Sequence, residues 1–569
     1  MNSCRRPSQF APIGRRTAQA LAFATCTLGI APAQAPPASM QAVIAPGVLT
    51  EADGGKGDVH VTLTIAGMDV AAGAPIAKLA VMLPGASKPQ AVEDVAVADA
   101  AGPAEVTSRV EGGALEWRCA RALQGVVTLR YRLPLDNAPP LAGGPPIGLR
   151  IDGDGFSGAG DRLILTPADD APRRLKIAWD LAAMGPGACG VSSYGDGDVE
   201  LPAGNLATLL NRLLLMAGHV ERVDQGPFSA VWTGKPGFDP RPAMRWTAEL
   251  HRALSTFFRD EREPPYRVFL RHNPMNAGGG AAMTNSFLVT WGTGVTGDNL
   301  QSILGHEMTH TWTSTGIGKW YDEGNAVYYQ ALLPWRAGMI TTAQYLADLN
   351  ATASRYYTNA VREAPDADVM PRFWSDTRYR VLPYDRGAMY FAVLNGKIRK
   401  ASVGKRSIDD LVLAMVLRLR NQEPVTEAVW IDLLRQELGE AGVAVHTSML
   451  AGGLMLPESD DFGPGFRRTV AKIRQFDVGF DLGLLVGATK RIQGLKPDSE
   501  AAKAGLRNGD LIRYATGLDA LQRDVTRPFD LTVTRDGKTF PLSYLPRGEA
   551  VDAWQWERVP GAPEPAHKE

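Results

Sequence analysis

Two histidines of this chain stand four residues apart with a glutamate between them, in the sequence HEMTH that begins at His306. On a helix, residues at positions i and i+4 project from one face, so His306 and His310 can reach one metal ion. Imidazole nitrogens bind Zn²⁺ at about 2.0–2.1 Å. Glu307 can then act as a general base toward a water that the metal activates. The pattern predicts a catalytic zinc centre, although HExxH alone also occurs by chance on ordinary polar helices.

A catalytic zinc site needs a third protein ligand and leaves one position open. Glu323 is the best candidate because it lies just downstream, in KWYDEGNAVYYQALL, which reads as the start of a second helix. Its neighbour Asp322 is the rival, but only Glu323 is followed directly by Gly324. We therefore expect His306, His310 and Glu323 to hold one zinc ion.

The segments around this motif predict the elements that position it. RPAMRWTAELHRALSTFFRD, residues 241–260, has helical spacing of apolar residues, and YRVFLRH and FLVTWG read as strands. The loop NAGGGAAMTNS joins the two strands, and we expect SFLVTWG to be the edge strand of the sheet. Asp298 with Gln301 three residues later predicts an N-cap and a capping box for the zinc helix. Helical patterns continue from about residue 325 to 450.

The rest of the chain predicts a multidomain protein. Strand-like alternation, as in DVHVTLTIAG, extends from about residue 40 to 235 and favours an antiparallel β-sandwich or a similar layered β domain. The expected parts are an N-terminal all-β domain (36–238), an α+β catalytic domain (239–335), an α-helical domain that completes the site (336–460), a small β-rich module (470–550) and a disordered tail (551–569).

The composition and the N-terminus restrict the class of protein. Lys+Arg number 60 and Asp+Glu 61, so no basic excess supports nucleic-acid binding. Four arginines, the apolar run ALAFATCTLGIA and APAQA are typical of a signal peptide over residues 1–35, cleaved after Ala35. We expect an exported protein, periplasmic or secreted, without an integral membrane segment in the mature chain. Cys119 and Cys189 would remain and can pair in an oxidising compartment.

Three segments resemble known metallopeptidase motifs. HEMTH followed by WYDEG-N-A-x-Y looks like the gluzincins, whose thermolysin-like domain holds zinc with two histidines and a downstream glutamate. LPYDRGAMYFAVL is similar to the P-Y-x-K/R-G segment of gluzincin aminopeptidases, which implies that Tyr384 hydrogen-bonds the oxyanion of the tetrahedral intermediate. Peptides or proteins are then the expected substrates.

The module at residues 470–550 resembles a PDZ domain of the bacterial protease type, through GLKPDSEAAKAGLRNGDLIRYATG and the hairpin sequence RDGK. The resemblance implies a peptide or C-terminus as ligand, received by the loop at Gly479–Leu484. A β domain, a gluzincin core and a PDZ domain together resemble the glycyl aminopeptidase family.

The chain departs from this family in the glycine-rich loop. Gly279, Gly280, Ala281 and Ala282 match its G-G-x-E segment and are the expected substrate-binding residues, with Ala282 where the amine-binding glutamate should be. An aminopeptidase is the family expectation, and an endopeptidase without the free-amine anchor is the alternative. A peptide-binding envelope protein with a relict zinc site and a scaffold with structural zinc remain open as non-enzyme alternatives.

Overall fold

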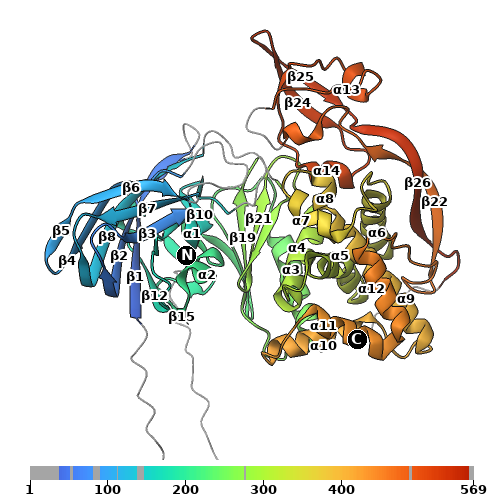
Figure 1. Cartoon of the computed structure of the whole chain (residues 1–569), viewed down its shortest axis with the longest axis horizontal. Helices are drawn as coiled ribbons and strands as arrows, with labels where there is room; N and C mark the ends of the chain where they lie inside the picture. The colour runs from blue at the N-terminus through green and yellow to red at the C-terminus, as the bar shows by residue number, and fades with distance from the viewer. Residues whose placement is uncertain are drawn as a thin grey trace, which may run out of the picture. The chain divides into compact units, whose positions relative to one another are not determined.

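The computed structural model describes residues 38–50, 55–80, 90–111, 113–137, 147–274, 277–485 and 490–562 (Figure 1). They form two compact units, the first within residues 38–136 and 149–220, and the second within residues 221–562 together with residues 137 and 147–148. The expected signal peptide lies outside the described residues. In these residues no helix is both long and apolar enough to cross a membrane.

The first unit is built from three sheets around one core. The seven-stranded sheet has the order β15 (Val199–Gly204), β12 (Arg173–Trp179), β1 (Ala38–Pro46), β2 (Lys56–Val70), β8 (Leu123–Asp136), β4 (Glu93–Asp99) and β5 (Gly102–Ala104). The five-stranded sheet has the order β14 (Gly195–Asp196), β13 (Cys189–Ser192), β16 (Leu214–Gly218), β10 (Gly155–Ala159) and β9 (Arg150–Asp152). The four-stranded sheet has the order β11 (Thr166–Pro167), β3 (Pro75–Ala80), β7 (Ala114–Cys119) and β6 (Val106–Glu111). Helices α1 (Gly160–Leu163) and α2 (Leu206–Asn211) and the 3₁₀ turn η2 (Ala182–Met184) connect them.

The alternation that predicted these strands is confirmed in β2. Val59, Val61, Leu63 and Ile65 are at most 1% exposed, whereas His60 points outward. Neighbouring strands pair antiparallel except β1 and β12, which are parallel. Cys119 and Cys189 are both buried, and among the described residues neither forms a disulfide, so the pairing considered from the sequence is not found.

The second unit opens with a five-stranded sheet in the order β17 (Glu221–Gln225), β18 (Phe228–Trp232), β19 (Tyr266–His272), β21 (Ser286–Trp291) and β20 (Gly280–Met283). β18, β19 and β21 are parallel, and β20 forms an antiparallel hairpin with β21 at one edge. β17 and β18 had been expected in the N-terminal β domain, which the sequence extended to residue 238. They belong to this sheet because Phe228 to Trp232 pair directly with Tyr266 to Leu270.

One helix lies between β18 and β19, and the others follow the sheet, as the sequence predicted. They are α3 (Arg241–Phe257), η3 (Asp298–Leu300), α4 (Gln301–Thr313), α5 (Lys319–Arg336), α6 (Thr342–Tyr357), η4 (Asp366–Asp368), α7 (Val369–Arg372), α8 (Thr377–Arg380), α9 (Leu382–Ala401), α10 (Ile408–Arg420), α11 (Glu427–Leu438) and α12 (Glu440–Leu450). The expected capping box at Asp298 is wrong. A 3₁₀ turn precedes α4 there, and α4 has no side-chain cap.

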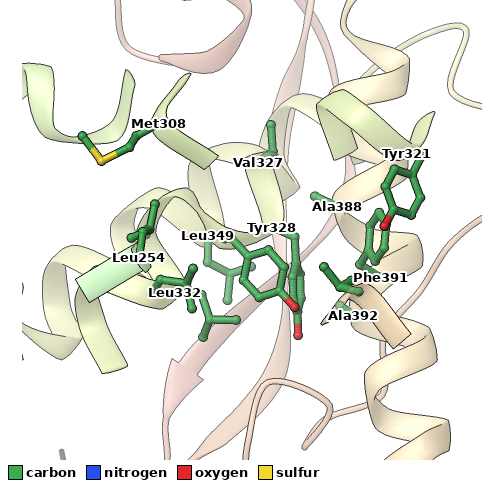
Figure 2. Close-up of a cluster of buried hydrophobic side chains, with 14 of the residues drawn as sticks. Leu254, Met308, Tyr321, Val327, Tyr328, Leu332, Leu349, Ala388, Phe391 and Ala392 are labelled. Carbon is green, nitrogen blue, oxygen red and sulfur yellow. The ribbon is translucent and has the colours of Figure 1, made fainter. Parts of the chain in front are cut away.

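One hydrophobic core supports α4, α5 and α9. Leu254 of α3 and Met308 of α4 lie on one side of it, and Tyr328, Leu332 and Phe391 fill its centre (Figure 2). Burying a large apolar side chain contributes about 1.5–3 kcal/mol relative to leaving it exposed. The helices that carry the HExxH motif, Glu323 and Tyr384 are therefore held by one packed body.

The C-terminal module has its own small core. It contains η5 (Leu482–Leu485), α13 (Glu500–Lys503), β23 (Leu511–Arg513), α14 (Leu518–Arg523), β24 (Phe529–Arg535) and β25 (Lys538–Tyr544), and it is reached through the long ribbon β22 (Phe466–Phe476) and β26 (Arg547–Arg558). The predicted disordered tail is wrong over residues 551–558. These residues form β26, which pairs with β22 and buries Ala553 and Trp556 in the larger core that supports α4, α5 and α9.

Candidate metal centre and catalytic groups

The zinc helix α4 packs unusually close to α5. A Cβ atom on Gly305 would lie 2.3 Å from the carbonyl oxygen of Gln330 in α5, so only glycine fits at this contact. The residue after this glycine is His306, and both are buried. The close approach therefore brings the first histidine of the motif within reach of the side chains of α5.

The three predicted metal ligands converge. His306 Nε2 and His310 Nε2 are 3.3 Å apart, and Glu323 Oε2 is 3.4 Å from His306 Nε2 and 3.3 Å from His310 Nε2. A tetrahedral ion with bonds of about 2.0–2.1 Å has edges of about 3.3–3.4 Å between its ligand atoms. Two imidazoles and a carboxylate at these distances fit Zn²⁺ and leave the fourth tetrahedral position free of these side chains.

The structure separates Glu323 from its rival Asp322. Asp322 accepts hydrogen bonds from the backbone N–H groups of Thr315 (2.8 Å) and Gly316 (3.1 Å). This carboxylate closes the short turn between α4 and α5 and is not among the three converging ligand atoms. It thereby holds the start of α5, the helix that carries Glu323.

Lys319 is a site residue that the sequence reading missed. Its ammonium donates to Glu323 Oε1 at 2.9 Å, which leaves Oε2 directed at the histidines. Burial acts to lower the pKa of Lys319, but the Glu323 carboxylate outweighs it and the pKa is raised. The i, i+4 spacing of Lys319 and Glu323 on one helix was the signal that could have revealed this contact.

Glu307 lies beside the metal site and is suited to proton transfer. Its side chain is partly exposed, in contrast to its buried neighbours His306 and Met308. Burial raises its pKa and Glu323 adds to the rise, while the two histidines and a hydrogen bond from the backbone of Ala282 act in the opposite direction. A raised carboxyl pKa strengthens a general base at neutral pH.

Tyr384 lies near the start of α9 and contacts one of the candidate metal ligands. Its ring stacks on His306 with 5.8 Å between centroids and 17° between planes. Burial raises the pKa of Tyr384, and the charges of Glu323 and Glu307 raise it further. The phenol therefore stays neutral and keeps its proton to donate. The next residue, Asp385, is fully buried in a two-bond ion pair with Arg355 of α6 (2.6 and 2.7 Å), which fixes this turn of α9.

Two glycines set the distance between α5 and α9. A Cβ atom on Gly324 would lie 2.6 Å from the Cα of Gly387, and one on Gly387 would lie 2.5 Å from the carbonyl oxygen of Trp320. Glu323 directly precedes Gly324, and Tyr384 stands three residues before Gly387. The contact between the two glycines therefore determines the position of the candidate zinc ligand relative to the tyrosine.

We expect Gly324→Ala to separate these helices. Overpacking costs about 1–3 kcal/mol, and the displacement of Glu323 should weaken zinc binding as well. Urea unfolding and competition with a chelator measure the two effects. Gly237→Ala is the matched control, because its Cβ would meet nothing within 4 Å. Wild-type zinc affinity in Gly324→Ala would show that the contact does not set the site.

The predicted substrate-binding residues lie at the sheet edge next to Glu307. Gly279 exchanges hydrogen bonds with Thr290, and Gly280, Ala281 and Ala282 form β20, the edge strand. The sequence reading had placed the edge at SFLVTWG, but that segment is β21, which is interior in the sheet. No acidic residue occurs in the sequence between Glu263 and Asp298, so β20 brings backbone groups and no carboxylate to the site.

Known metallopeptidases are similar to parts of this sequence and to its fold. Residues 313–370 match the model of the M61 glycyl aminopeptidase family, and no curated protein matches the chain. The fold is similar to that of an aminopeptidase N family protein from Idiomarina loihiensis, with a TM-score of 0.64 and 16% identity over 91% of this chain and 98% of that chain.

Two further solved structures are more distant. The M1 zinc metallopeptidase of Deinococcus radiodurans has a TM-score of 0.43 and 16% identity over 74% of this chain and 94% of that chain. Leukotriene A4 hydrolase of Saccharomyces cerevisiae has a TM-score of 0.44 and 12% identity over 74% of this chain and 69% of that chain. The ligand geometry at the site, with the M61 match beside it, identifies the chain as a zinc metallopeptidase.

Proposed function

We propose that this protein is an exported zinc peptidase of the glycyl aminopeptidase type. The observation that carries the proposal is the convergence of His306, His310 and Glu323 at tetrahedral spacing, with Glu307 on the helix of the two histidines and the ring of Tyr384 stacked on His306. The M61 match over residues 313–370 supports the aminopeptidase type. The signal-like residues 1–35 support export to the periplasm or medium.

The residues of the site divide the reaction between them. Bound zinc would supply a Lewis acid and an activated water. Glu307 takes a proton from the attacking water as its oxygen bonds to the carbonyl carbon, and delivers that proton to the leaving nitrogen as the C–N bond breaks. Tyr384 donates its phenol hydrogen bond to the carbonyl oxygen as negative charge develops there. An extended peptide can pair with the free edge of β20, which orients the scissile bond.

A second candidate is a zinc endopeptidase, and Ala282 favours it. A glutamate in this position would bind the free α-amino group of a substrate. Ala282 has no carboxylate, and its backbone N–H donates a hydrogen bond to Glu307. The hydrolytic groups are unaffected by this difference. The peptide-binding envelope protein with a relict zinc site is disfavoured, because the candidate ligands, base and tyrosine are all in place together.

Paired peptides test the proposal. The mature chain, residues 36–569, is assayed on peptides that are identical except for a free or an acetylated N-terminus. We expect cleavage of the free peptide with release of its first residue. Internal cleavage of the free and the acetylated peptide at equal rates would contradict the aminopeptidase assignment and support the endopeptidase. No cleavage of any member of a peptide library by a zinc-loaded protein would contradict both.

A further inference from the structure

The short helix α14 of the C-terminal module packs against α6 and is hydrogen-bonded to α8 (Figure 1). Asp519 accepts two parallel hydrogen bonds from Arg380, at 2.9 Å from Nε to Oδ2 and 2.6 Å from Nη2 to Oδ1, and it also accepts from the hydroxyl of Thr377. Gln522 donates to the same hydroxyl at 2.7 Å. The module thus grips α8, and α8 is separated from α9 by Val381 alone.

This grip lies close to Tyr384. Arg380 is four residues before the tyrosine, and the charge of Asp519 contributes to the raised pKa of Tyr384 after burial, Glu323 and Glu307. Asp385, the residue after the tyrosine, accepts two hydrogen bonds from Arg355. Two arginine–aspartate pairs therefore fix the chain before and after Tyr384, and one of their four members, Asp519, belongs to the C-terminal module.

A second contact links the module to the zinc helices. Arg523 donates to Asp348 Oδ1 at 2.5 Å and to Thr352 at 3.1 Å, both on α6. Asp348 also accepts from Ser302 of α4 and from Gln330 of α5, each at 2.8 Å. One carboxylate thus joins the helix of the histidines, the helix of Glu323 and the module.

The Arg380–Asp519 pair is suited to hold α8 in position and adds little to the stability of the fold. The Arg380 side chain is 25% exposed and that of Asp519 is 41% exposed. Pairs exposed to this degree contribute little to stability, about 0–1 kcal/mol. A two-bond arginine–carboxylate pair instead restricts geometry. Its loss should alter where α8 and the start of α9 lie more than whether the protein folds.

We propose that the C-terminal module is a fixed part of the peptidase, in which Asp519 and Arg523 are positioning residues for Tyr384 and for the zinc helices. The inference rests on the proposed function. In this arrangement the module presents α14 to the helices that carry Tyr384 and the zinc site.

A charge swap tests the Asp519 contact in the full mature chain. Asp519→Arg and Arg380→Asp should each lower kcat about 10- to 100-fold, because small misplacements of catalytic groups have effects of this size. KM, zinc content and the urea midpoint should stay near wild type, and the Asp519→Arg/Arg380→Asp double variant should recover most of kcat. Asp498→Arg, an exposed charge reversal elsewhere on the module, should have no effect.

Combination with Tyr384→Phe identifies the group that is positioned. Once the phenol hydroxyl is gone, Asp519→Arg should lower kcat by no more than about twofold, since coupled residues are non-additive. Equal losses in both backgrounds, or no recovery in the swap, would overturn the proposal.

A readout that does not need turnover separates this inference from the proposed function. Hydrogen exchange of the amides of residues 377–390 should be about tenfold faster in Asp519→Arg and normal in the swap. Unchanged exchange would overturn the inference even in an active enzyme. If the wild-type protein cleaves no peptide, exchange that is faster in Asp519→Arg and normal in the swap would support the inference and contradict the proposed function.

Discussion

Glu307→Gln is expected to bind one zinc ion as tightly as the wild type and to lose at least about 10³-fold in kcat, within the range that general acid–base catalysis contributes. The amide keeps the size of the side chain and can still contact the backbone of Ala282, but it cannot take a proton. Because Glu307 is not one of the converging ligand atoms, metal binding should be unaffected. Metal analysis and single-turnover kinetics measure the two quantities on one preparation.

The matched control for this variant is Glu249→Gln, an exposed position on α3 in the same unit. It should match the wild type in zinc content and in kcat. Peptide turnover within about tenfold of wild type by zinc-loaded Glu307→Gln would remove the general-base role that the site geometry assigns. Loss of zinc together with activity would instead make Glu307 part of the metal site.

The sequence predicted which three residues converge, because helical spacing determines part of this arrangement locally. His306 and His310 share a face on any regular helix, and Glu323 needed only a second helix nearby. What brings the two helices together is not local. The close contact of Gly305 with Gln330 depends on the packing of α4 on α5, which no spacing within one segment reveals.

The errors came from residues whose partners are distant in the sequence. Residues 551–558 were read as part of a tail because the segment is short and followed by PGAPEPAHKE. Their strand exists only because β22, far earlier in the chain, pairs with them and the core accepts Trp556. The edge strand was misplaced for the same reason, since the short β20 is identified only by its hairpin with β21.

The local sequence does not decide which of Asp322 and Glu323 faces the histidines. Both carboxylates precede Gly324, and residue type alone allows either to bind a metal ion. The short turn after α4 decides the matter, because its free N–H groups at Thr315 and Gly316 engage Asp322. The helix then turns Glu323 toward the histidines and Lys319 toward its second oxygen.

Tyr384→Phe is the second large effect that we expect, a loss of about 10²–10³-fold in kcat with zinc content and KM nearly unchanged. Removal of one oxyanion donor typically has this consequence, because the hydrogen bond strengthens only as charge develops. The phenyl ring can still stack on His306, so the variant removes the hydroxyl alone. Steady-state kinetics and metal analysis test the prediction, and Tyr194→Phe in the first unit serves as the matched control.

A transition-state analogue makes the assignment of Tyr384 sharper than the rate alone. A phosphinic peptide carries a tetrahedral anionic group where the substrate has its carbonyl, so Tyr384→Phe should weaken its binding by a factor close to the loss in kcat/KM. Binding of an uncleaved substrate to the Glu307→Gln background should hardly change. Equal weakening of both ligands would mean that Tyr384 holds the peptide in its ground state. The tyrosine would then contribute to substrate binding and not to stabilisation of the oxyanion.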